Sequence, residues 1–147
     1  MSYVGHPFQG CRREDRLLTD QELLDGFASG ALPKEAFHHV EHVRTAWMFV
    51  RRHGMPSALT EFPNALRRFA IAKGAPNLYH ETITWAYLLL IAERVQQTST
   101  DSWAEFSAAH PELLGWKPSI LDRYYSADTL WSDKARQMFV MPDRIAP

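Results

Sequence analysis

Two short segments of the chain concentrate side chains that can bind metals or transfer protons. Residues 37–42 read Phe-His-His-Val-Glu-His, and residues 79–82 read Tyr-His-Glu-Thr. Together they contain four of the seven histidines in the chain. Neutral imidazole is a common ligand of transition metals and a common acid or base near neutral pH. These two segments are therefore the first candidates for a functional site.

The histidine spacing favours a metal site. His39 and His42 should share one face of a helix, because residues three apart lie side by side there. His39 also falls in the same row as Val43, which an amphipathic helix buries, whereas His38, the alternative partner of His42, points outward. A metal site needs at least one more protein ligand, and His80 is the best candidate because it is expected on the most apolar helix. We therefore predict that His39, His42 and His80 converge on one ion.

Glu81 completes this predicted site as a fourth ligand or as a general base. On a regular helix it points about 100° away from His80, so both side chains reach one ion only if the first turn is irregular. Imidazoles with one carboxylate suit Zn²⁺, Fe²⁺ or Ni²⁺, whereas Mg²⁺ and Ca²⁺ prefer oxygen ligands. An open coordination position would activate water or bind a substrate. The first hypothesis is a metal-dependent enzyme that acts on a small molecule, with Glu81 as the catalytic residue.

A second hypothesis gives the same residues a structural role. A His-x-x-His pair is common on helices by chance, and a buried histidine usually bonds a backbone carbonyl or a carboxylate. His80 and Glu81 would then form a buried polar network that fixes the register of the helices. The five tryptophans would build the core and an apolar face for a partner. On this hypothesis the protein is a binding or interaction module without catalysis.

Other catalytic devices are missing from the sequence. It contains no Gly-x-Ser-x-Gly motif, no dinucleotide-binding fingerprint and no phosphate-binding loop. The one cysteine, Cys11, falls in an irregular N-terminal stretch. Residues 122–126, Asp-Arg-Tyr-Tyr-Ser, form a third polar cluster, whose tyrosines either line a pocket or cap the core. Arg123 and Arg136 are candidate ion-pair partners of Glu81.

Hydrophobic residues three and four apart predict an all-α domain, a compact bundle of about five to seven helices. Thr19 and Glu22 form a capping box that starts the first helix, and Gly30 ends it. Further helices are expected over residues 33–53, 56–74, 78–97 and 102–110, followed by shorter helical pieces over 119–125 and 128–140.

Three details of this helical pattern bear on the candidate site. The helix over 78–97 is apolar on almost every side, so we expect it at the centre of the fold, with Asn77 as its N-cap. Pro63 predicts a kink or a break in the helix over 56–74. The C-terminal piece over 128–140 is expected to turn Trp131 and Met138 inward.

Composition limits the class of protein. The chain has 147 residues, 46% of them hydrophobic, and a formal net charge of -1, which gives no electrostatic basis for binding nucleic acid or an anionic membrane. One cysteine allows no internal disulfide, and no signal peptide or membrane-spanning stretch is apparent. We expect a soluble, cytoplasmic protein with an extended arm over residues 1–16 and one helical domain over 17–147.

Overall fold

Short helices joined by tight turns make up the fold. The computed structural model describes residues 18–144, and the predicted N-terminal arm lies outside this range. The described residues form seven α-helices and no β-strand, which confirms the predicted all-α fold. The α-helices are α2 (Asp20–Ser29), α3 (His39–His53), α4 (Ser57–Ala72), α5 (Glu81–Gln97), α6 (Trp103–Ala109), α7 (Ala127–Leu130) and α8 (Asp133–Gln137). Four 3-10 turns connect them, namely η3 (Lys34–Ala36), η4 (Pro76–Leu78), η5 (Pro111–Leu113) and η6 (Ile120–Arg123).

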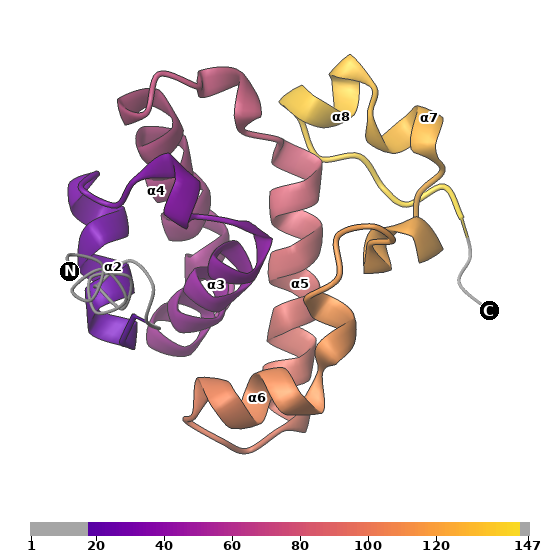
Figure 1. Cartoon of the computed structure of the whole chain (residues 1–147). Coiled ribbons are helices and arrows are strands. Elements are labelled where there is room, and N and C mark those ends of the chain that lie inside the picture. Colours follow the sequence, from indigo (N-terminus) through magenta and orange to yellow (C-terminus); the bar gives the residue numbers. More distant parts are fainter. Residues whose placement is uncertain (1–17, 145–147) are drawn as a thin grey trace, which may run out of the picture.

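Helices α3, α4 and α5 pack against one another and form the centre of the bundle. Helix α5 stands in the middle of the molecule, with α2, α3 and α4 on one side and the C-terminal α7 and α8 on the other (Figure 1). Leu88 and Ile91 on α5 are completely buried, in agreement with the predicted central position of this helix. None of the helices within residues 18–144 has the length and apolar character needed to cross a membrane.

Helix α3 begins later than its sequence pattern predicts. The chain forms the turn η3, becomes extended at Phe37 and His38, and enters α3 only at His39. Burial of the Phe37 side chain in the core and a 2.8 Å hydrogen bond from the His38 backbone N–H to the Glu41 carboxylate stabilise this restart. His39 and His42 therefore lie in the first turns of α3 rather than in the middle of a longer helix.

Helix α5 also begins later than predicted, at Glu81. Its N-cap is His80, whose ring accepts a hydrogen bond from the Ile83 backbone N–H, and not Asn77, which lies in the turn η4. The prediction that His80 stands on the helix itself is therefore wrong. His80 caps the N-terminus of the helix instead, and the hydrogen bond to the Ile83 N–H fixes the orientation of its ring.

The structure also bears on the predictions for Pro63 and for the C-terminal helical piece. Helix α4 runs through Pro63 without a break, so the alternative of two separate segments is wrong. The C-terminal piece divides into α7 and α8, because Ser132 caps a new helix start at Asp133. Trp131 and Met138 are 51% and 52% exposed, so the expected inward orientation of both side chains is wrong.

Candidate functional site

A cavity of about 660 Å³ lies between α3, α4 and α5, beside the loop that carries Trp116 and the C-terminal helices. Its walls are mainly apolar and include Ala46, Phe62, Leu66, Phe69, Ala70 and Ile83. Four histidines also line it, namely His38, His39, His42 and His80. The structure thus brings the three predicted metal ligands to one cavity, where each side chain has a different environment.

His39 is anchored to the loop after η5. Its Nε2–H donates a 3.0 Å hydrogen bond to the carbonyl oxygen of Leu113, and its ring lies 5.0 Å from the rings of both Tyr87 and Trp116. Burial lowers the pKa of His39, and the bond to Leu113 only partly opposes this effect. The neutral tautomer set by this bond leaves Nδ1 as an acceptor without a hydrogen-bond partner among the described residues.

His42 lines the cavity without a hydrogen bond from its ring to any described group. Its ring packs on Phe37, with 4.1 Å between ring centroids, and no described group forms a hydrogen bond with either ring nitrogen. Burial lowers its pKa to about 4, and the neighbouring His39 and His38 add to the shift. At neutral pH His42 is therefore an uncharged imidazole that keeps one donor and one acceptor for another molecule.

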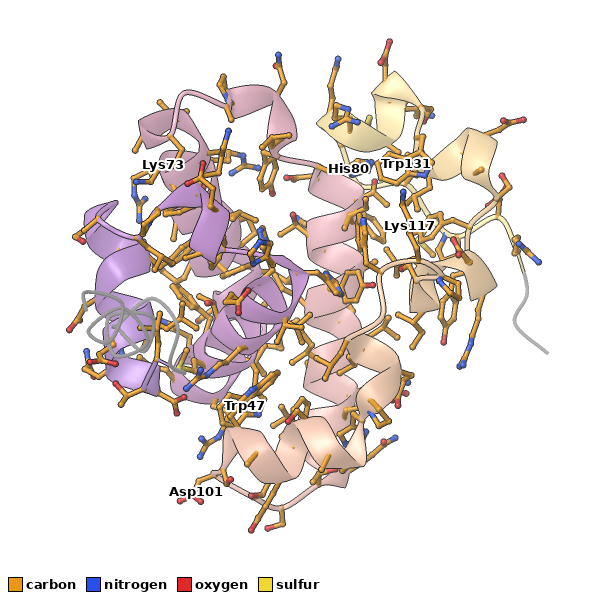
Figure 2. The ribbon with its side chains drawn as sticks, viewed as in Figure 1. Trp47, Lys73, His80, Asp101, Lys117 and Trp131 are labelled. Atoms are coloured by element: carbon orange, nitrogen blue, oxygen red, sulfur yellow. The ribbon has the colours of Figure 1, made fainter. Side chains whose placement is uncertain are left out.

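His80 has both ring nitrogens occupied. Nδ1 accepts the hydrogen bond from the Ile83 N–H at 3.1 Å, and Nε2–H donates to the carbonyl oxygen of Leu130 at 2.8 Å. Burial lowers its pKa, and the positive charge of Arg136 contributes to the same direction. Figure 2 shows His80 next to Trp131, where α5 meets the C-terminal helices. His80 joins two parts of the fold, and this ring has no lone pair left for an ion.

Glu81 does not line the cavity. Its Oε1 accepts a 2.6 Å bond from an Arg67 guanidinium nitrogen and another 2.6 Å bond from the Tyr79 hydroxyl. The Arg67 guanidinium also lies over the Tyr79 ring, and burial together with Glu81 raises the pKa of that tyrosine. The partner of Glu81 is thus Arg67 on α4, rather than Arg123 or Arg136. These contacts are structural, but they do not join Glu81 to His80, which the second hypothesis placed in one polar network.

The geometry does not assemble the predicted metal centre. Within residues 18–144, no three histidine, cysteine, aspartate or glutamate side chains are grouped so that they could hold an ion. His39 and His42 each retain a free nitrogen, whereas His80 and Glu81 are engaged elsewhere. Metal binding by His39, His42, His80 and Glu81 therefore stays a prediction without support from the arrangement of these side chains.

Exposed side chains mark the mouth of the cavity. Leu78, Trp116 and Trp131 line it and are 68%, 40% and 51% exposed, although all three are large and apolar. The rings of Trp116 and Trp131 meet edge to face, with centroids 6.5 Å apart. Nothing in the hydrophobic spacing indicates these contacts, because Trp116 belongs to an irregular loop. The sequence offers one indication of an exposed Trp116: this large aromatic residue stands between Gly115 and Lys117, in a segment without helical periodicity that would bury it.

The Asp122–Ser126 cluster lies outside this cavity and holds the C-terminal segment in place. Ser126 donates hydrogen bonds to the Asp143 carboxylate from both its backbone N–H and its hydroxyl. The Tyr125 hydroxyl donates to the carbonyl oxygen of Val140 at 2.8 Å. Asp122 accepts from the Ser119 backbone N–H and so caps the turn η6. These polar residues are used for tertiary structure.

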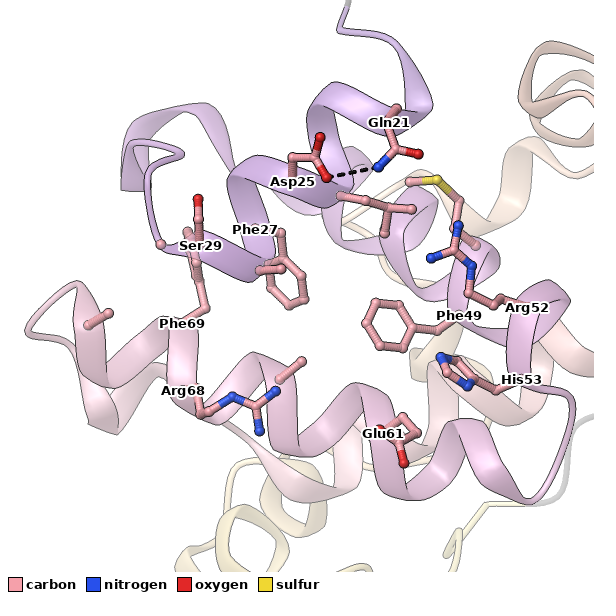
Figure 3. A pocket seen from close by; sticks show the side chains of 16 residues that line it. Gln21, Asp25, Phe27, Ser29, Phe49, Arg52, His53, Glu61, Arg68 and Phe69 are labelled. Carbon is pink, nitrogen blue, oxygen red and sulfur yellow. Dashed lines mark hydrogen bonds between the residues drawn. The ribbon is translucent and has the colours of Figure 1, made fainter.

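A smaller groove of about 330 Å³ lies between α2, α3 and α4. Figure 3 shows Phe27 and Phe49 facing it, with Glu61 and Arg68 on the α4 side. Gln21 and Asp25 on α2 bond to each other at 2.8 Å along its edge. The groove carries side chains of both charges, and its only histidine is the exposed His53. It therefore lacks the combination of apolar volume and free imidazoles found in the larger cavity.

The chain matches no protein-family model, and neither a curated protein nor a solved structure shows significant similarity to it. The assignment of a function therefore depends on the geometry of the larger cavity.

Proposed function

We propose that this protein binds a small, mainly apolar molecule in the cavity between α3, α4 and α5. The observation that carries the proposal is the size and lining of this space. Ligand pockets in proteins are typically about 300–1,000 Å³, mostly apolar, with a few polar groups that orient the ligand. A cavity of about 660 Å³ with aliphatic and aromatic walls and two incompletely bonded imidazoles fits this description.

His42 and His39 are the orienting groups in this proposal. Both have lowered pKa values, so both are neutral at pH 7. An apolar ligand beside them therefore does not have to displace water from a charged group, which would cost free energy. His42 offers a donor and an acceptor, and His39 offers the acceptor Nδ1. A hydroxyl, amide or carbonyl group in the part of the ligand that enters the cavity would satisfy these nitrogens and fix the orientation of that part.

The proposal corresponds to the binding-module hypothesis and extends it with a specific site. The alternative, a metal-dependent enzyme, requires a third ligand beside His39 and His42. Metal analysis of protein purified without a His-tag separates the two: stoichiometric Zn, Fe or Ni would favour the enzyme.

A matched pair of variants on α4 tests the binding proposal. Ala70 lines the cavity and Ala65 lines the groove of Figure 3, and both are 9% exposed. We expect the neutral fluorescent probe N-phenyl-1-naphthylamine to bind saturably to the unmodified protein. Ala70→Leu should weaken this binding by about tenfold, because three added carbons occupy the ligand's space, which corresponds to about 1.4 kcal/mol. Ala65→Leu should leave the affinity unchanged.

Circular dichroism and thermal melts of both variants control for folding. Absence of saturable probe binding to the unmodified protein would contradict the proposal. Equal weakening by Ala65→Leu and Ala70→Leu would contradict the assigned location.

A further inference from the structure

We propose that the natural ligand of this cavity is an amphiphilic anion, a monocarboxylic acid whose carboxylate binds Arg136 at the cavity mouth while its apolar part enters the cavity. This inference rests on the proposed function and adds the chemical class of the ligand. It depends on three observations: the state of Arg136, the other charges around the mouth and the position of the apolar walls.

Arg136 is a half-buried arginine without an acidic partner. Four arginines are half-buried among residues 18–144. Three of them, Arg44, Arg67 and Arg94, each bind a carboxylate oxygen at 2.6 Å. Arg136 instead donates a single 3.1 Å hydrogen bond to the carbonyl oxygen of Asn77, and no described carboxylate lies within ion-pair distance of it. Its guanidinium carries five N–H donors in a planar fork, the geometry that binds a carboxylate through two parallel bonds.

The charges around the cavity have one sign. Besides Arg136, two lysines line it, Lys34 in the turn η3 and Lys73 at the end of α4. The Lys73 ammonium group donates to the carbonyl oxygen of Gly30 at 2.6 Å, which leaves its charge without an acidic partner in the described chain. No described aspartate or glutamate lines the cavity. Asp122 lies outside the cavity, in an adjoining hollow that shares Trp116 and Trp131 with it. The charged side chains that line the cavity itself therefore favour an anion over a cation.

The three cations line the cavity from separate elements, Lys34 from η3, Lys73 from the end of α4 and Arg136 from α8. Figure 2 shows Lys73 at the end of α4, well to the left of His80 and Trp131, which lie where α5 meets the C-terminal helices. The positive charge of Arg136 reaches His80, since it contributes to the lowered pKa of that ring. The apolar residues Leu66, Phe69 and Ile83 line the same cavity and receive the hydrocarbon part of the ligand. Arg136 and the apolar walls together match a molecule with one charged end.

Displacement of the neutral probe by a matched pair of competitors tests this inference. Octanoate and octan-1-ol share one alkyl length and differ in head-group charge. We expect octanoate to displace the probe from the unmodified protein at a lower concentration than octan-1-ol. Arg136→Gln should weaken octanoate about tenfold and leave octan-1-ol unchanged. Lys134→Gln removes an exposed cation from the same helix, outside the cavity, and should change neither competitor.

A measurement on the unmodified protein makes the test independent of variant folding. Raising NaCl from low to high concentration should weaken octanoate and not octan-1-ol, because salt screens the ionic part of binding. Two results would contradict the anionic head group while leaving the binding cavity supported. One is that octan-1-ol displaces the probe and octanoate binds no better. The other is that Arg136→Gln and salt affect both competitors equally. If the probe itself does not bind, both proposals fail.

Discussion

At the scale of single residues, three of the four imidazoles that line the cavity have three different roles. Both ring nitrogens of His80 form hydrogen bonds within the protein, one nitrogen of His39 does, and neither nitrogen of His42 does among the described residues. The difference follows from what lies within reach of each ring: the carbonyl groups of Leu130 and Leu113 approach His80 and His39, whereas His42 packs on Phe37. The ring nitrogens of His42 are not among the buried atoms without a partner, so they remain accessible from the cavity and can bond a ligand there.

His42 should make the protein sensitive to acid. Its pKa in the folded state is about 4, below its ordinary value of 6.5, so the unfolded chain binds the proton more readily. The free energy of unfolding should therefore fall as the pH decreases from about 6.5 to 4. His42→Gln removes the titrating group at this position. We therefore expect the variant to lose about 2 kcal/mol less stability than the unmodified protein between pH 7 and pH 4. This value follows from 1.36 kcal/mol per pKa unit, reduced for the partial contact of the ring with solvent.

Urea denaturation at several pH values measures this effect. His53→Gln is the control, because His53 lies on the same helix with an exposed ring that water hydrates in both states. The same dependence of stability on pH in unmodified protein and His42→Gln would show that the folded state does not disfavour a charged His42.

At the scale of secondary-structure elements, the N-terminus of α5 depends on a contact from a distant part of the chain. The helix begins next to η4, and the His80 ring bonds both to the first turn of α5 and to Leu130, the last residue of α7. The cap therefore couples the start of the central helix to residues 50 positions further along the chain. This coupling places the α7 and α8 segment, with Trp131 and Arg136, at the mouth of the cavity.

His80 should consequently be a structural residue. We expect His80→Ala to lower the free energy of unfolding by about 1–3 kcal/mol, because it removes an N-cap bond and leaves the Leu130 carbonyl without its partner. His80→Asn should recover part of this loss, since asparagine is a favourable N-cap. Chemical denaturation with and without a chelator measures both variants. A loss that appears only in the presence of metal would instead support the metal site predicted from the sequence.

The elements differ in how far local sequence determines them. The capping box of Thr19 and Glu22 and the left-handed Gly30, with φ of 77°, were predictable because each depends on neighbours a few residues away. The cap at His80 was not, because histidine is not a common N-cap and its second bond comes from Leu130. The histidines of both segments line one cavity, whereas Glu81 does not. How their ring nitrogens divide between the protein and the cavity depends on tertiary contacts that no spacing rule contains.

At the scale of the whole molecule, three central helices leave a space that the C-terminal helices border without filling. Helices α3, α4 and α5 build the walls, and α8 packs on α5. Because Trp131 is turned outward at the junction of α7 and α8, its ring lines the mouth instead of filling the core. The smaller groove between α2, α3 and α4 is a competing site on another part of the surface, so locating a bound ligand distinguishes the two directly (Figure 3).

The central claim, that the larger cavity is the binding site, is tested most directly by an NMR titration of isotope-labelled protein with octan-1-ol. We predict saturable changes in amide chemical shift at His39, His42 and Thr84 and at the indole of Trp116, all of which line the cavity. The Ala70→Leu variant should reduce these changes, which ties them to occupancy of the space. Changes concentrated around Phe49 and Glu61 in the groove, or the absence of a saturable response anywhere, would contradict the claim.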